Sequence, residues 1–222
     1  MSGTTPQEHH LVVPRTARWY SLGAPGAPER WIACHGYGQL AVKFLRAFAP
    51  LDDGTRRIVA PEALSRFYLD AAAGRAAEPR IGASWMTRED REHEIADQGS
   101  WLDALHQALD REDRGATGRL VVLGFSQGVS TVCRWLARGR VRADRVILWA
   151  GSLPPELDLG DAALFLRHVE VALVAGDADT IVPAAVVEAQ AAALRAAGIA
   201  CTLHRFAGGH AIDAGTLRAL AP

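Results

Sequence analysis

The chain has 222 residues, of which 49% are hydrophobic and 22% charged, so there is enough apolar material for a sizeable core. Its 24 Lys and Arg residues nearly balance 25 Asp and Glu residues, which leaves no basic excess for nucleic-acid binding dominated by phosphate contacts. Asparagine is absent, which excludes N-glycosylation and a Cys-His-Asn triad.

The three cysteines are odd in number and form no C-x-x-C pair, which favours a reducing compartment. The first ten residues are polar and lack the apolar core of a signal peptide. No apolar run approaches the roughly 20 residues needed to cross a bilayer. We therefore expect one cytoplasmic domain over residues 1–222, with no membrane span.

Short apolar runs alternate with helical patterns along the chain. The apolar runs predict strands at 11–13, 18–21, 31–34, 57–60, 120–125, 146–149, 169–175 and 201–206. Apolar residues at helical spacing predict helices over 40–48, 95–109, 129–136, 183–194 and 211–220. This alternation predicts an α/β fold, with a mostly parallel central sheet and helices on both faces.

The segment Glu62–Glu94 has the weakest pattern. It is polar and rich in Ala and Gly, and it contains the apolar side chains Phe67, Tyr68, Trp85 and Met86. Two interpretations are open: a lid or pocket wall lined by these four side chains, or a surface connection that they anchor. Because the core elements use most of the chain, no separate cap domain is expected.

The strongest local signal is the G-x-S-x-G motif at Gly124–Gly128, which contains Ser126. A buried-strand pattern leads directly into it and an amphipathic helix pattern follows, the context of a nucleophile elbow. This sharp turn strains the backbone of the serine, and the two glycines remove side chains that would collide there. We predict that Ser126 is a nucleophile; the alternative is an ordinary glycine-rich turn.

A serine hydroxyl is a poor nucleophile without a general base, and the base needs an orienting acid. In folds of this type the expected chain order is Ser, acid, His. Asp177 and Asp179 follow one predicted strand and His210 follows the last, at the sheet edge where open α/β sheets bind ligands. We predict His210 as the base and favour Asp179 over Asp177 as the acid, with Asp177 bracing the turn.

A tetrahedral oxyanion needs two backbone N–H donors. One is predicted to be the amide of Gln127, directly after the nucleophile. The other is expected in the segment Cys34–Gln39, hereafter the oxyanion loop, whose glycines let the backbone approach a substrate. We predict the Tyr37 amide as this second donor, and we expect His35 to hold the loop by hydrogen bonds.

These segments together resemble the α/β-hydrolase superfamily, and within it the phospholipase/carboxylesterase group that includes acyl-protein thioesterases. The resemblance extends from about Trp31 to His210. The Asp-Pro-x-Val-Pro pattern of the family matches residues 179–183 with Thr180 in place of the first proline, and it selects Asp179. Residues 83–85 also resemble a family segment near the acyl pocket. One departure is Gln39, because family members often have His-Gly-x-Gly-Asp in the oxyanion loop.

The resemblance implies a serine hydrolase that cleaves carboxylic esters through an acyl-enzyme, with no cofactor and no metal. Because only residues 62–94 can cover the site, we expect short to medium acyl chains in a small-molecule ester or thioester. Lysophospholipase or acyl-protein thioesterase activity is an alternative within the same chemistry. A catalytically silent hydrolase-fold binding protein is the alternative from another class.

Overall fold

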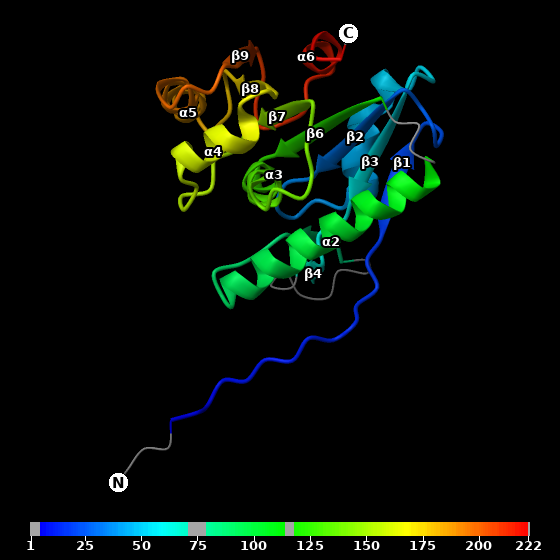
Figure 1. Ribbon diagram of the computed structural model, residues 1–222, viewed down its shortest axis with the longest axis vertical. Coiled ribbons are helices and arrows are strands. Elements are labelled where there is room, and N and C mark those ends of the chain that lie inside the picture. Colours follow the sequence, from blue (N-terminus) through cyan, green and yellow to red (C-terminus); the bar gives the residue numbers. More distant parts are fainter. Residues whose placement is uncertain (1–4, 71–78, 114–117, 222) are drawn as a thin grey trace.

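The centre of the molecule is a seven-stranded sheet in the order β1-β3-β2-β6-β7-β8-β9 (Figure 1). A computed structural model describes residues 5–70, 79–113 and 118–221. The sheet strands are β1 (Trp19–Leu22), β2 (Glu29–Cys34), β3 (Arg56–Pro61), β6 (Arg119–Phe125), β7 (Arg145–Trp149), β8 (Glu170–Gly176) and β9 (Cys201–Phe206). All neighbours are parallel except β1, which runs antiparallel to β3. The mostly parallel sheet predicted from the sequence is confirmed.

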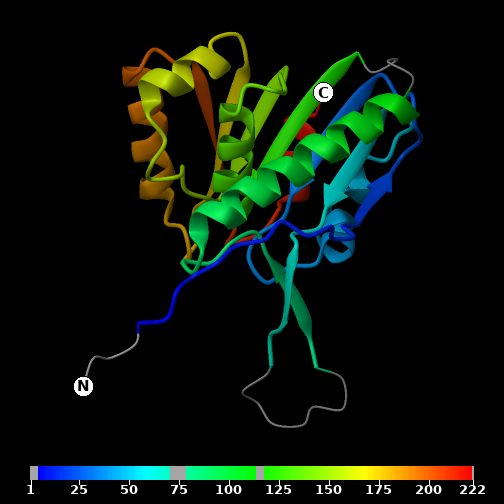
Figure 2. The same ribbon diagram turned by 60° about the horizontal axis from the view of Figure 1, so that its bottom comes forward.

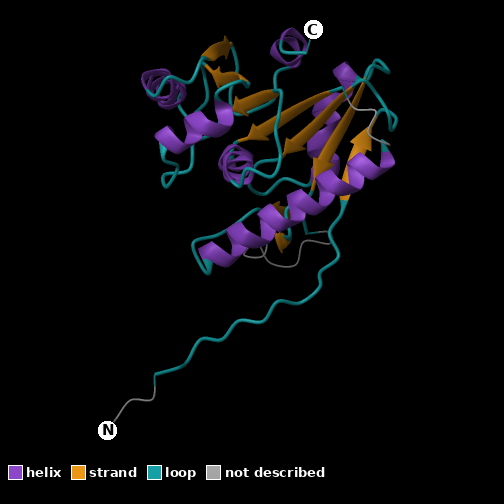
Figure 3. Ribbon diagram, viewed as in Figure 1, coloured by secondary structure: helices purple, strands orange, loops and turns teal. Residues whose placement is uncertain are grey.

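Helices cover both faces of this sheet (Figure 3). They are α1 (Ala41–Leu45), the 3-10 helix η1 (Arg46–Leu51), α2 (Arg91–Glu112), α3 (Gln127–Ala137), α4 (Leu159–Leu166), α5 (Ala184–Ala196) and α6 (Ala214–Ala219). Helices α2 to α5 pack into one apolar core, whereas α1, η1 and α6 pack into the other.

Strand β6 shows why the apolar runs of the sequence are uninterrupted. Val122 packs with α2 to α5, while its neighbours Val121 and Leu123 pack with α1, η1 and α6. Because successive side chains of a strand point to opposite faces, a strand covered on both faces must be apolar throughout. Because β2, β3 and β6 to β9 run parallel, their carboxyl ends lie at one edge of the sheet.

The strand predicted at 11–13 is wrong. Leu11 and Val12 are 85% and 94% exposed, and the segment before β1 extends away from the sheet (Figure 1). The position beside β3 is already occupied by β1, and Pro14 has no backbone N–H to donate to a neighbouring strand. The triplet 11–13 is therefore part of an exposed segment outside the sheet.

The segment 62–94 contains a hairpin that the sequence analysis did not predict. Strands β4 (Ser65–Tyr68) and β5 (Ile81–Ser84) pair antiparallel and project from the body of the molecule (Figure 2). Residues 71–78 of the segment 62–94 lie outside the described residues, and the last residues of this segment form the start of α2. Helix α4 was also missed, although Asp158 caps it by accepting a hydrogen bond from the Asp161 amide.

Within the described ranges, no helix is both long enough and apolar enough to span a membrane.

Two of the three cysteines are fully buried, which makes their reactivity a test of the packing. Burial raises the pKa of Cys133 in α3 to about 12, and it raises the pKa of Cys34 in β2 as well. A raised pKa keeps a thiol protonated and unreactive near neutral pH. Folded protein at about pH 8 should therefore react promptly with Ellman's reagent at no more than the half-buried Cys201. All three thiols should react after unfolding in guanidinium, and prompt reaction of all three in the folded protein would contradict this packing.

Candidate active site

Ser126 stands between the last residue of β6 and the first residue of α3. Its backbone has φ 54° and ψ −118°, a positive φ that is strained for any residue other than glycine. A side chain at Gly128 would lie 2.2 Å from the Cys34 carbonyl oxygen, and one at Gly124 would lie 2.4 Å from that of Gly128. Only glycine fits at these two positions, so the motif permits the close packing of β6, α3 and the end of β2 that forms the turn.

His210 and Asp179 are in direct contact. His210 Nδ1 lies 2.7 Å from Asp179 Oδ2, and the Asp179 side chain is buried. Asp179 Oδ1 accepts hydrogen bonds from the amides of Ile181 and Val182 at 2.8 and 2.9 Å. Burial alone would raise the pKa of Asp179, but the hydrogen bonds from these amides and from His210 bring it below its ordinary value. The carboxylate is therefore ionised at neutral pH.

Asp177 lies apart from this pair. Its Oδ1 accepts a hydrogen bond from Arg205 Nε at 2.7 Å on the exposed surface. Of the two acids in the loop after β8, the structure thus brings only Asp179 to His210.

The loop that carries His210 packs against the turn at Gly124–Gly128, hereafter the elbow. The His210 ring lies 4.9 Å, centroid to centroid, from the ring of Phe125, the residue before Ser126. The adjacent Ala211 carbonyl accepts a hydrogen bond from the indole of Trp149 at 3.0 Å, and Trp149 is fully buried. With Nδ1 hydrogen-bonded to Asp179, Nε2 is the acceptor nitrogen of the neutral imidazole.

The oxyanion loop lies next to Ser126. A Cβ added to Gly36 would lie 3.0 Å from Ser126 Cβ, so the loop backbone directly approaches the elbow. His35 is fully buried; its Nδ1 is 2.8 Å from the Gly36 carbonyl, and its Nε2 accepts from the Ala63 amide at 3.1 Å. Burial lowers the pKa of His35, which keeps the ring neutral. These contacts fit a residue that holds the loop.

The four predicted pocket residues lie in different surroundings. Phe67 packs against Tyr37 of the oxyanion loop with ring centroids 5.2 Å apart. Trp85 is 2% exposed and donates its indole N–H to the His35 carbonyl at 2.8 Å, so it packs beneath the loop. Tyr68 is 58% exposed on the projecting hairpin. Met86 Sδ lies 3.1 Å from a guanidinium nitrogen of Arg134.

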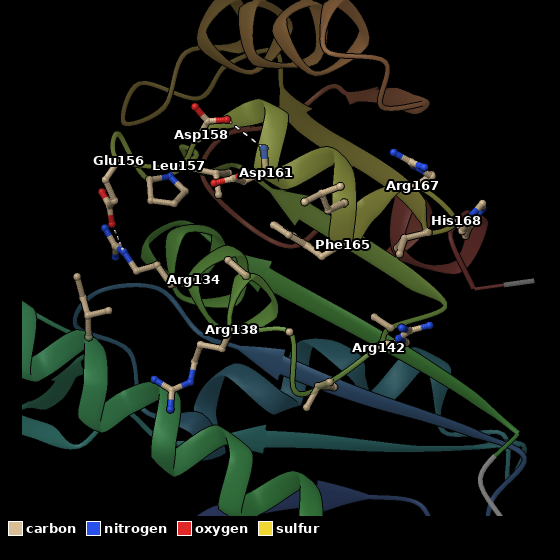
Figure 4. Close-up of a pocket in the computed structure, with 18 of the residues that line it drawn as sticks. Arg134, Arg138, Arg142, Glu156, Leu157, Asp158, Asp161, Phe165, Arg167 and His168 are labelled. Atoms are coloured by element: carbon tan, nitrogen blue, oxygen red, sulfur yellow. Dashed lines mark hydrogen bonds and ion pairs between the residues drawn. The ribbon is translucent and has the colours of Figure 1, made fainter.

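Two other features of the described part lie outside this site. A groove of about 1090 Å³ is lined by side chains of α2, α3, α4 and the connections around them, including Arg138, Phe165 and His168 (Figure 4). None of the candidate triad residues lines it. The exposed side chains of His10, Asp90 and His93 hold potential metal ligand atoms within 4.8 Å of one another, again without a triad member.

The phospholipase/carboxylesterase family profile matches residues 27–221. No curated protein matches the sequence. Among solved structures, the carboxylesterase from Mesorhizobium loti has a TM-score of 0.70 at 19% identity, covering 92% of this chain and 94% of its own. Acyl-protein thioesterase 2 from Zea mays has a TM-score of 0.68 at 18% identity, covering 92% and 96%.

A third similar structure, esterase PE8, has a TM-score of 0.66 at 21% identity and covers 93% of this chain and 98% of its own. At such identities the likeness establishes the α/β-hydrolase fold, and the family match extends over most of the sequence. The chain therefore belongs to the phospholipase/carboxylesterase family of hydrolases.

Proposed function

We propose that this protein is a serine esterase that hydrolyses carboxylic esters of short to medium acyl chains. The observation that carries the proposal is the hydrogen bond between His210 and Asp179, beside a serine held at positive φ. A buried, ionised carboxylate on one imidazole nitrogen leaves the other nitrogen as a general base. That is the arrangement a serine hydroxyl needs in order to become a nucleophile.

In the proposed reaction, His210 Nε2 removes the proton of Ser126 Oγ as the oxygen attacks the acyl carbon. Asp179 keeps the proton of the imidazole on Nδ1 and stabilises the imidazolium that forms. The amides of Tyr37 and Gln127 donate hydrogen bonds to the oxyanion. His210 then protonates the leaving alkoxide or thiolate. Water, deprotonated by the same nitrogen, hydrolyses the acyl-enzyme and releases the acid.

The proposed preference for short to medium acyl chains rests on the hairpin β4–β5. Phe67 lies against the exposed Tyr37 ring, which supplies apolar surface next to the proposed oxyanion donors. We expect one hairpin to cover only a short length of acyl chain, so that a longer chain extends into water. The unpaired thiols of the described cysteines fit the cytoplasmic location proposed for the enzyme.

Replacing Ser126 with alanine should abolish nearly all ester hydrolysis while the protein still folds, because the serine side chain adds little packing. Removal of a triad member typically lowers kcat by several orders of magnitude. The test is p-nitrophenyl ester turnover with circular dichroism as the folding control. If more than about a tenth of the activity remains, Ser126 is not the nucleophile.

Asp179→Asn should lower the rate by orders of magnitude, because an amide at this position favours the wrong imidazole tautomer. Asp177→Asn is the matched control, since Asp177 pairs with Arg205 on the surface and should be nearly silent. Comparison of kcat/KM for the two variants decides the assignment. Greater damage from the Asp177 variant would reverse it.

The dependence of kcat/KM on acyl length should rise and then level off or fall. Each buried methylene contributes up to about 0.8 kcal/mol while it stays within apolar walls, and nothing once it reaches water. We expect the turning point at roughly four to eight carbons, the range of an uncapped cleft. A series of p-nitrophenyl esters measures this profile. A steady rise to about sixteen carbons would instead favour a lysophospholipase or acyl-protein thioesterase.

A covalent fluorophosphonate probe separates the enzyme from a silent binding protein of the same fold. Labelling that disappears in the Ser126→Ala variant supports catalysis, whereas an unlabelled wild-type protein would indicate a binding role.

A further inference from the structure

The side chain of Gln127 joins the elbow to the last residue of β5 and the two residues that follow it. Its Oε1 accepts a hydrogen bond from the Trp85 amide at 3.0 Å. Its Nε2 donates to the Met86 carbonyl at 2.9 Å and to Ser84 Oγ at 3.2 Å. Because the donors and the acceptor of this amide all engage three consecutive residues, the segment Ser84–Met86 is fixed to the first residue of α3.

The same part of the hairpin is fixed at its other side to the oxyanion loop. The Trp85 indole donates to the His35 carbonyl at 2.8 Å. The Gly38 amide donates to the Ala83 carbonyl at 2.9 Å, and the Ala83 amide donates to the Gln39 carbonyl at 3.2 Å. A side chain at Gly82 would lie 2.4 Å from the Gly38 carbonyl oxygen, so this close approach requires glycine. The hairpin is therefore a bridge between the oxyanion loop and the elbow.

Contacts within the oxyanion loop fix the direction of the Tyr37 amide. In a trans peptide the C=O and N–H groups point to opposite sides, and no cis peptide occurs among the described residues. The Gly36 carbonyl, which shares a peptide plane with the Tyr37 amide, lies 2.8 Å from His35 Nδ1 and accepts from the Gln39 amide at 3.2 Å. The Tyr37 N–H must then point away from the buried His35 ring.

We propose that the Gln127 side chain is a positioning group that sets the spacing between the two oxyanion donors, an inference that rests on the esterase function proposed above. The Gln127 amide belongs to the elbow and the Tyr37 amide to the oxyanion loop. The hydrogen-bonded path from Gln127 through Trp85 to His35 ties these two segments together. An oxyanion hole stabilises a transition state only if its donors are held in place before the reaction, so loss of this path should weaken transition-state binding more than substrate binding.

The direct test is Gln127→Met, which keeps the length of the side chain and removes its hydrogen bonds. We expect kcat for a p-nitrophenyl butyrate substrate to fall roughly tenfold to hundredfold, less than the loss of a whole donor, with KM within about twofold. Affinity for a trifluoromethyl ketone, which forms a tetrahedral adduct with a serine nucleophile, should fall in proportion to kcat/KM. Ser84→Ala, which removes only the hydroxyl contacts, should show a smaller decrease of the same kind.

Gln98→Met is the matched control, because Gln98 is a buried glutamine whose Nε2 donates to the Glu94 carbonyl of its own helix at 3.0 Å. This variant should keep the wild-type kcat. Hydrogen exchange supplies a readout that does not depend on activity: the Trp85 amide should exchange faster in Gln127→Met and unchanged in Gln98→Met.

The outcomes separate this inference from the function on which it rests. Wild-type turnover with an unchanged kcat in Gln127→Met would overturn the positioning role alone. So would a loss explained entirely by unfolded protein, with full kcat per titrated active site. A wild-type protein with neither turnover nor serine labelling would overturn the esterase function and this inference together.

Discussion

The close contact between the start of α3 and the end of β2 is the constraint on which the candidate site depends. Gly128 lies so near the Cys34 carbonyl that no side chain fits between them. This contact forces the chain to reverse within one residue, which gives Ser126 its positive φ and presents it at the sheet edge. It also brings the oxyanion loop, which begins at Cys34, against Ser126. One steric contact thus places Ser126 at the sheet edge and brings the oxyanion loop close to it.

Two buried polar side chains lie around this contact, and only Asp179, whose charge the proposed reaction uses, is ionised. Asp179 is buried but remains ionised because two backbone amides and His210 donate to it. His35, equally buried, is kept neutral and serves as a donor and an acceptor within the backbone network. The two imidazoles therefore differ in their hydrogen-bond partners, which are a carboxylate for His210 and backbone groups for His35.

The sequence was informative where a local pattern directly encodes the structure. Buried parallel strands must be apolar throughout, so a run such as Leu120–Phe125 predicts its strand, and Gly124 is required by a close contact with Gly128 four residues away. The same directness holds for His210 and Asp179, whose positions at strand ends imply a shared edge of the sheet. That edge brings the two together, as their hydrogen bond shows.

What the sequence did not predict depends on long-range pairing. The hairpin β4–β5 is short and half-polar, and its stability comes from contacts with the oxyanion loop and Gln127, which no local pattern reports. For Trp85 the sequence left two interpretations open, a pocket wall or an anchor of a surface connection, and it did not report that the indole N–H faces the His35 carbonyl and that the ring is buried. Conversely, the apolar residues 11–13 match a strand pattern but are exposed and pair with no strand. The G-x-S-Q-G sequence names Gln127 without indicating what its side chain contacts.

The central claim is that an acyl-enzyme forms on Ser126, and rapid-quench mass spectrometry tests it most directly. The protein is mixed with excess p-nitrophenyl butyrate, quenched in acid within the first turnover, and measured intact and after digestion. The account predicts a mass increase equal to one butyryl group, located on the peptide that contains Ser126. In the His210→Ala variant this adduct accumulates only if the substitution slows hydrolysis of the acyl-enzyme more than it slows acylation. Product release without any such adduct in the wild-type protein across the pre-steady-state interval, or an adduct on another residue, would contradict it.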